Sequence, residues 1–119
     1  MPQITVDYSA PLAEGFDRRG FALALHEVTA EIAATQEAGC KTRFRVTEDT
    51  TVGRDADGHA VVHVMIGLLP GRTDETKARL TEAVLELLRT HVKPLAGLTL
   101  HASAEVRELD ASYRKFVAG

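Results

Sequence analysis

The residue best suited to chemistry is the proline at position 2, which directly follows Met1. Methionine aminopeptidases remove Met when the next residue is small, so we expect a mature chain that begins with a proline secondary amine. An α-amino group titrates at roughly 7.7–8.0, and burial or nearby cations lower its pKa by disfavouring the charged form. Pro2 is therefore a candidate general base near neutral pH. Many proteins begin Met-Pro, so this prediction needs support from other residues.

Three cations alternate on one face of a predicted strand: Lys41, Arg43 and Arg45. Like charges along one face of a strand repel one another. An anionic ligand bound to this face is one explanation, and a solvated face is the other. The sequence leaves both open.

A further cation, Arg72, lies in the segment Pro70–Asp74 just before a predicted helix. Free backbone N–H groups and the helix dipole favour an anion at such a place. The planar guanidinium adds two parallel donors that match a carboxylate. We expect either a substrate carboxylate here or an ordinary solvent-exposed arginine in a turn.

The elements that position these residues follow from hydrophobic periodicity. Alternating apolar residues predict four strands: Gln3–Ser9, Lys41–Thr47, Ala60–Leu68 and Leu98–Val106. Apolar positions three and four apart predict a helix from Asp17 that stops near Gly39, and a second helix that is capped by Thr73 and ended by Pro94. The remaining segments are predicted as a loop over Ala10–Phe16, a loop or hairpin over Thr50–Gly58 and a short tail over Asp110–Gly119.

The two halves repeat the same order of elements at a constant offset of about 57 residues. We predict one domain over residues 1–119 with pseudo-repeats 1–58 and 59–119. Each half is β-α-β, and a right-handed crossover makes its two strands parallel. The fold class is therefore α+β, a four-stranded sheet with both helices on one face. The open face is either solvated or covered by other copies, and the apolar second face of Ala60–Leu68 favours assembly.

Composition excludes several classes of protein. The 119 residues carry a net charge of −3, which gives no general attraction for nucleic acid. The longest apolar stretch, Ala60–Leu69, is too short to span a membrane, and no signal peptide is apparent, so we expect a cytoplasmic protein. Cys40 is alone, so it forms no intrachain disulfide and we expect a small buried side chain. His59 and His63 are about 13 Å apart along a strand, so we expect no metal site.

Together these residues resemble the 5-carboxymethyl-2-hydroxymuconate Δ-isomerase family of the tautomerase superfamily. The resemblance covers most of the chain. Its motifs are Met1-Pro2 with Ile4-Thr5-Val6, Ala38-Gly39, Asp57-Gly58-His59, Val62-His63-Val64, Gly71-Arg72-Thr73, Leu85-Glu86-Leu87-Leu88, Thr90-His91 and Glu108-Leu109.

The resemblance implies a tautomerase-like fold, a homotrimer and a cofactor-independent isomerase. Pro2 would move a proton within an unsaturated dicarboxylic acid such as 5-carboxymethyl-2-hydroxymuconate, an intermediate of homoprotocatechuate-type degradation. Arg72 would hold a substrate carboxylate, and Arg43 matches the second arginine of the family's Arg-x-Arg pair. Lys41 stands where that pair has its first arginine, and an ammonium lacks the bidentate fork.

Three alternatives remain open. The chain could be a tautomerase or dehalogenase of another small keto acid, because a fold does not fix its substrate. It could be an inactive trimeric member of the family. A ferredoxin-like module that binds nucleic acid or metal shares the order of elements, but the strands lack aromatic platforms and the chain lacks a Cys/His cluster.

Overall fold

A computed structural model describes all 119 residues of the chain. Its strands and helices are β1 (Gln3–Ser9), α1 (Arg18–Ala33), β2 (Lys41–Thr47), β3 (His59–Leu68), α2 (Asp74–His91) and β4 (Thr99–Glu108). Two short 3₁₀ helices cover Ala10–Gly15 and Glu37–Gly39. The predicted bounds of β1 and β2 are confirmed, whereas β3 begins one residue earlier than predicted and β4 is shifted toward the carboxyl end.

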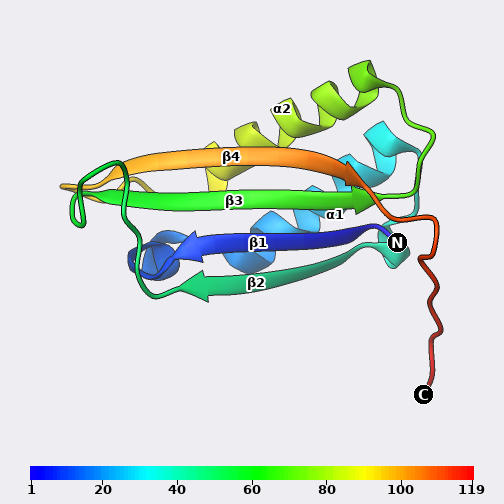
Figure 1. Ribbon diagram of the computed structural model, residues 1–119, viewed down its shortest axis with the longest axis horizontal. Coiled ribbons are helices and arrows are strands. Elements are labelled where there is room, and N and C mark those ends of the chain that lie inside the picture. Colours follow the sequence, from blue (N-terminus) through cyan, green and yellow to red (C-terminus); the bar gives the residue numbers. More distant parts are fainter.

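The strands form one sheet in the order β2-β1-β3-β4. β1 is parallel to β2, β3 is parallel to β4, and the central pair β1 and β3 is antiparallel. Both helices lie behind the sheet, on the same face (Figure 1). The predicted α+β fold of two β-α-β units is thus confirmed, and the boundary between pseudo-repeats at residues 58 and 59 stays a prediction.

The core lies between the sheet and the two helices. Alternate residues of the central strands face the helices and are fully buried, among them Ile4, Val6 and Val64. Phe21 of α1 and Val84 of α2 cover them with equally buried side chains. Burial of each such side chain is worth about 1.5–3 kcal/mol, so this layer fixes which face of each strand is left open.

Each α-helix begins after a residue whose side chain caps its first turn. The side chain of Asp17 accepts a hydrogen bond from Gly20 N at 3.0 Å, and Thr73 accepts one from Thr76 N at 3.1 Å. These bonds satisfy backbone donors that a helix start leaves unpaired. The predicted cap at Thr73 is confirmed.

Two predictions about connections were wrong. Ala10–Phe16 is not an open loop, because Ala10–Gly15 forms a 3₁₀ helix that buries Leu12. Gly39 does not stop the first helix, which ends at Ala33 when Ala34 adopts a left-handed conformation with φ 55°. Gly39 instead lies where a Cβ would be 2.6 Å from the Met1 carbonyl oxygen. A side chain there would push the amino end of the chain away.

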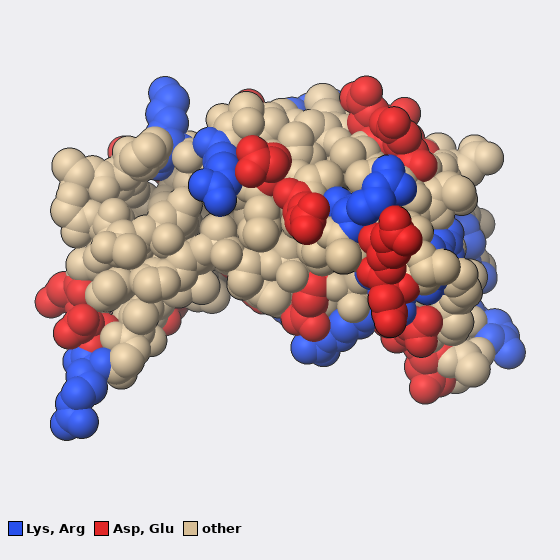
Figure 2. Space-filling view, turned by 90° about the horizontal axis from the view of Figure 1, so that it is seen from above, with Lys and Arg blue, Asp and Glu red and all other residues tan.

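Apart from Val61 and Met65 of β3, the open face of the sheet carries mostly polar side chains. The register sets Lys41, Arg43 and Arg45 of β2 beside β1 residues on this face, as the alternation predicted. One of the three cations is neutralised, since Arg45 Nε lies 2.9 Å from Asp7 Oδ1. Seen from above in Figure 2, acidic and basic side chains are interspersed over the molecule. Neither helix is both long enough and apolar enough to cross a membrane.

Candidate active site

Pro2 is buried at the amino end of β1, beside the start of β2. The backbone N–H of Lys41 donates to the Pro2 carbonyl at 3.2 Å, which extends the β1–β2 pairing by one residue. The residue before Pro2 is also closely packed, because the Gly39 backbone lies against the carbonyl group of Met1. Pro2 therefore has a fixed position next to a cationic strand.

The amino group of Met1 has a cationic and partly buried environment. It donates to the Gly39 carbonyl at 3.2 Å, and Lys41 Nζ donates to the same oxygen at 2.8 Å. Burial, the adjacent Lys41 ammonium and the charge of Lys115 lower the pKa of the Met1 amino group from its ordinary 8.0 to about 6. The Met1 amino group is thus mostly neutral at pH 7 and can accept a proton.

Arg43 belongs to a short series of side-chain hydrogen bonds next to Pro2. Its Nη1 donates to Gln3 Oε1 at 3.0 Å, and Gln3 Nε2 donates to the Tyr113 hydroxyl at 3.2 Å. A turn closed by Tyr113 N and the Asp110 carbonyl at 2.9 Å brings this tyrosine back to the sheet. Sequence reasoning missed Gln3 and Tyr113, because the tail carries no periodic pattern that could place Tyr113.

Arg72 has a different environment. Its Nε donates to the Ala33 carbonyl at 3.0 Å and its Nη1 donates to the Leu69 carbonyl at 3.2 Å. The first of these carbonyls is at the end of α1, where a helix leaves acceptors unpaired and attracts cations. The structure thus brings Pro2, Lys41 and Arg43 together, whereas Arg72 lies beyond β3 at the same end of the sheet, against the end of α1.

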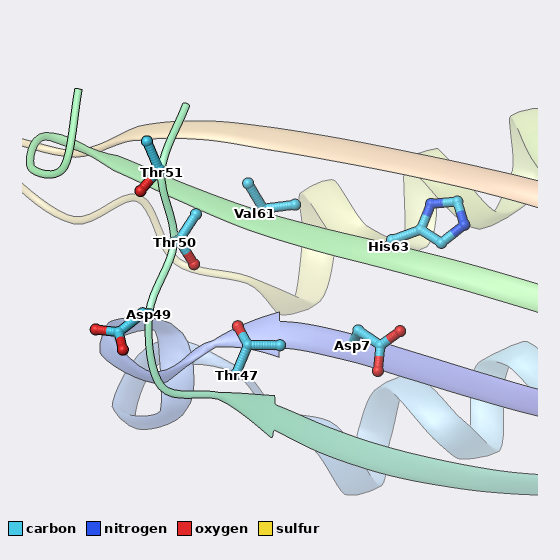
Figure 3. Close-up of a pocket in the computed structure, with 7 residues that line it drawn as sticks. All are labelled: Asp7, Thr47, Asp49, Thr50, Thr51, Val61 and His63. Atoms are coloured by element: carbon cyan, nitrogen blue, oxygen red, sulfur yellow. The ribbon is translucent and has the colours of Figure 1, made fainter. Parts of the chain in front are cut away.

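None of the three pockets of the chain is lined by Pro2, Lys41, Arg43 or Arg72. One pocket of about 290 Å³ opens on the polar face of the sheet, under the loop after β2 (Figure 3). Its lining is mostly polar: Asp7, Thr47, Asp49, Thr50, Thr51, Val61 and His63. A single chain thus holds the predicted site residues without an enclosed cavity around them.

His63 lies on the polar face of the sheet and not in the core. Its Nδ1 is 2.6 Å from Ser103 Oγ and its Nε2 is 2.8 Å from Glu105 Oε2. Glu105 also accepts from Arg107 Nε at 2.8 Å. The bonds from Arg107 and then from His63 lower the pKa of the Glu105 carboxyl. His63 thus has a hydrogen-bond partner at each ring nitrogen, and the carboxylate of Glu105 is shared between His63 and Arg107.

Cys40 is buried directly before β2, as predicted. Burial raises the pKa of its thiol. A thiol that resists deprotonation is a poor nucleophile, so Cys40 contributes packing next to the site and not chemistry.

Comparison with known families decides the kind of protein. The family model described as 5-carboxymethyl-2-hydroxymuconate isomerase matches residues 2–116. The chain belongs to this family. It is an isomerase of the tautomerase superfamily, as its resemblance in sequence implied. No curated protein matches the chain in sequence.

Solved structures agree on the fold. A 5-carboxymethyl-2-hydroxymuconate isomerase from Deinococcus radiodurans R1 superposes with a TM-score of 0.78 at 21% identity, over 96% of this chain and 88% of that one. A 5-carboxymethyl-2-hydroxymuconate delta-isomerase gives 0.73 at 14% identity, over 99% and 89%. A fused 4-OT protein, described as a symmetric trimer, gives 0.76 at 19% identity, over 99% and 94%. The fold is thus retained although few residues are shared.

Proposed function

We propose that the protein is a cofactor-independent isomerase of unsaturated 2-hydroxy or 2-oxo dicarboxylic acids, such as 5-carboxymethyl-2-hydroxymuconate, with Pro2 as the base. The observation that supports this most is the chain's amino end, where burial and Lys41 lower the pKa of an amine to about 6. Removal of Met1 would turn the Pro2 nitrogen from an amide into a secondary amine at the same end of the chain, beside Lys41. Such a base can accept and return a proton at neutral pH.

The reaction needs only one base. The amine of Pro2 would take the proton from the 2-hydroxyl group, which leaves a dienolate with its charge spread along the conjugated chain. The resulting ammonium would then return the proton to the carbon at the other end of that chain. One base can make both transfers when it lies over the face of the planar substrate, and no redox step or added reactant is required.

Lys41 and Arg43 are the proposed ligands of the substrate carboxylate and the developing oxyanion. Neither has an acidic partner within the chain, since Lys41 Nζ and Arg43 Nη1 donate to neutral oxygens instead. Fixed cations aimed at the position where negative charge develops stabilise the transition state. Arg72 is the third proposed ligand of the substrate. Its contacts with Ala33 and Leu69 use Nε and Nη1 and leave Nη2 available to donate to a carboxylate.

The absence of a pocket around Pro2 supports a site that several copies complete. The polar sheet face and both edge strands are uncovered in one chain. A similar structure, the fused 4-OT protein, is described as a symmetric trimer. We therefore propose a homotrimer in which a neighbouring copy closes the space over Pro2. A cytoplasmic location and a place in homoprotocatechuate-type degradation remain predictions.

Lys41 favours a second candidate function, the conversion of a different small keto acid. An ammonium binds a carboxylate as a point charge, whereas the family's arginine makes two parallel hydrogen bonds. Chains of similar fold include a malonate semialdehyde decarboxylase and a member of the cis-3-chloroacrylic acid dehalogenase family, each 23% identical. If Lys41→Arg raises activity on 5-carboxymethyl-2-hydroxymuconate, the native substrate differs from that acid.

The test compares the activity of the protein with and without Met1. Intact mass spectrometry of material from the native host identifies the form, and ultraviolet absorbance follows the ketonisation of 5-carboxymethyl-2-hydroxymuconate. We expect the Met1-free form to be active and the Met1-retaining form to have a kcat lower by about 10²–10⁴-fold, since general base catalysis contributes that much. Equal rates for both forms would remove Pro2 as the base. No turnover by either form would point to an inactive member of the family.

A further inference from the structure

Two histidines that are distant in the sequence meet on the polar face of the sheet. His59 begins β3 and His101 lies near the start of β4. The register sets His101 opposite Val61, so the two histidines are diagonal neighbours on adjacent strands. His59 Nδ1 and His101 Nε2 are 2.9 Å apart and form a hydrogen bond in the metal-free chain. We propose that these two nitrogens form a binding site for a divalent transition metal ion of the Ni²⁺ or Cu²⁺ type.

A metal ion would replace the proton of this hydrogen bond, and the two nitrogens are already about as far apart as two metal-bound imidazoles. Imidazole nitrogens bind metals at roughly 2.0–2.1 Å. Two of them bound at right angles to one another are therefore about 2.9 Å apart, and two at a tetrahedral angle are about 3.3 Å apart. Right angles occur in the square-planar and octahedral geometries that Cu²⁺ and Ni²⁺ adopt. No group of three or more His, Cys, Asp or Glu side chains converges in the chain, so the proposed site uses two protein ligands and water would take the other positions.

Asp55 orients the ring of His59 for metal binding. Asp55 Oδ2 lies 3.2 Å from His59 Nε2, on the opposite side of the ring from His101. A carboxylate at this place fixes the ring proton on Nε2, as in the carboxylate–histidine–metal arrangement. The lone pair of Nδ1 then accepts from His101 Nε2 in the metal-free chain and can bind a metal ion in place of that proton. The side chain of His59 is only 23% exposed, so its ring is also held by packing. His59 is thus a preoriented ligand, and His101 supplies the second nitrogen.

The charges around His59 also favour a cation. A pocket of about 380 Å³ is lined by His59 together with Glu48, Asp49 and Asp57 of the loop after β2. Their negative field lowers the free energy of a divalent ion nearby. The pair is at the start of β3, whereas Pro2 is beside the end of β3, at the opposite end of the sheet (Figure 1). The proposed metal site therefore stands independently of the proposed isomerase site.

The experiment is a calorimetric titration of the untagged, chelator-treated protein with Ni²⁺. We expect saturable binding of one Ni²⁺ per chain and a rise in Tm with increasing Ni²⁺, because a ligand of the folded state stabilises it. His59→Ala and His101→Ala should each weaken binding about 100-fold or more, because the second nitrogen then no longer adds its chelate effect. Asp55→Asn should weaken it about 10–100-fold, as expected for loss of an orienting carboxylate.

His63→Ala is the matched control, since His63 lies on the same strand face but bonds to Ser103 and Glu105. It should bind Ni²⁺ as the wild type does. Wild-type binding that persists in the double variant His59→Ala/His101→Ala would overturn the proposal, and so would the lack of any saturable binding. Affinity that His63→Ala reduces as much as His101→Ala does would also overturn it. Circular dichroism confirms that each variant is folded.

Discussion

The two edge strands of the sheet occupy equivalent places but have different charge environments. On β4, Glu105 accepts from Arg107 Nε at 2.8 Å and lies 2.8 Å from His63 Nε2, so the charged groups satisfy one another. On β2, Lys41 and Arg43 donate to a backbone carbonyl and to the Gln3 amide. Both strands have the same topology, each parallel to its inner neighbour.

The difference shows where a ligand can bind. A charge that already has a partner gains little from a new one, whereas a cation without a carboxylate gains a full ion pair from an incoming anion. Only β2 offers such cations, and it offers them beside Pro2. The comparison therefore supports the proposed carboxylate-binding role of β2, and the predictions below test it from the largest expected effect to the smallest.

Among variants of the two edge strands, Arg43→Ala should reduce catalysis the most. Arg43→Ala deletes the guanidinium that we place on the substrate carboxylate, and hydrogen bonds to charged groups are worth about 1.5–3 kcal/mol. We expect kcat/KM to fall about 10- to 100-fold in an ultraviolet assay with 5-carboxymethyl-2-hydroxymuconate. Arg107→Ala on β4 is the matched control and should leave kcat/KM unchanged. Equal losses of kcat/KM in Arg43→Ala and Arg107→Ala would contradict a carboxylate-binding role specific to β2.

Lys41→Met should raise the pKa of the Met1 amino group in protein that retains Met1. Lys41 disfavours the protonated amine, so its loss favours protonation and moves the pKa from about 6 toward the ordinary 8.0. The shift should be partial, because burial is the larger cause and remains. The pH dependence of amine acetylation measures it. Arg45→Met should cause no shift, because Asp7 neutralises that cation; equal shifts in the two variants would contradict a local effect of Lys41.

Arg72→Ala should lower the stability of the fold. The variant leaves the Ala33 carbonyl at the end of α1 without its donor, and such a hydrogen bond is worth about 1 kcal/mol. The midpoint of urea unfolding measures the loss, and Arg79→Ala on the exposed side of α2 is the control. The proposed substrate role predicts a higher KM as well. Reduced stability with an unchanged KM would remove Arg72 from the site and leave it as a helix cap.

Glu105→Gln should have the smallest effect of these variants, and that effect concerns the stability of the fold. Glu105 is solvated, and exposed ion pairs contribute little to stability. Its lowered pKa means that any contribution is present at neutral pH and is lost as the pH falls through the folded-state pKa. We expect equal urea midpoints for the variant and the wild type at pH 7 and at pH 3. A lower midpoint for the variant at pH 7 alone would show that the β4 pairs stabilise the sheet.

The fold could be read from the sequence because its signals are local. The alternation in Gln3–Ser9 and Lys41–Thr47 predicted two strands, and the helix between them made the pair parallel. Parallel strands that start at Gln3 and Lys41 have their amino ends together, so the proximity of Pro2, Lys41 and Arg43 was also predictable. The end of α1 was not, because the left-handed Ala34 that ends the helix has no signature of the kind a glycine gives.

The sequence by itself determined the strands, the start of each α-helix, the buried face of these elements and the position of Pro2 beside two cations. Only the tertiary structure decided that Arg72 contacts Ala33, that Tyr113 contacts Gln3 and that His59 meets His101. The physical reason is that periodicity reports the environment of each residue along its own element. Contacts between distant segments depend on the sheet order and register, which the packing of the whole core selects.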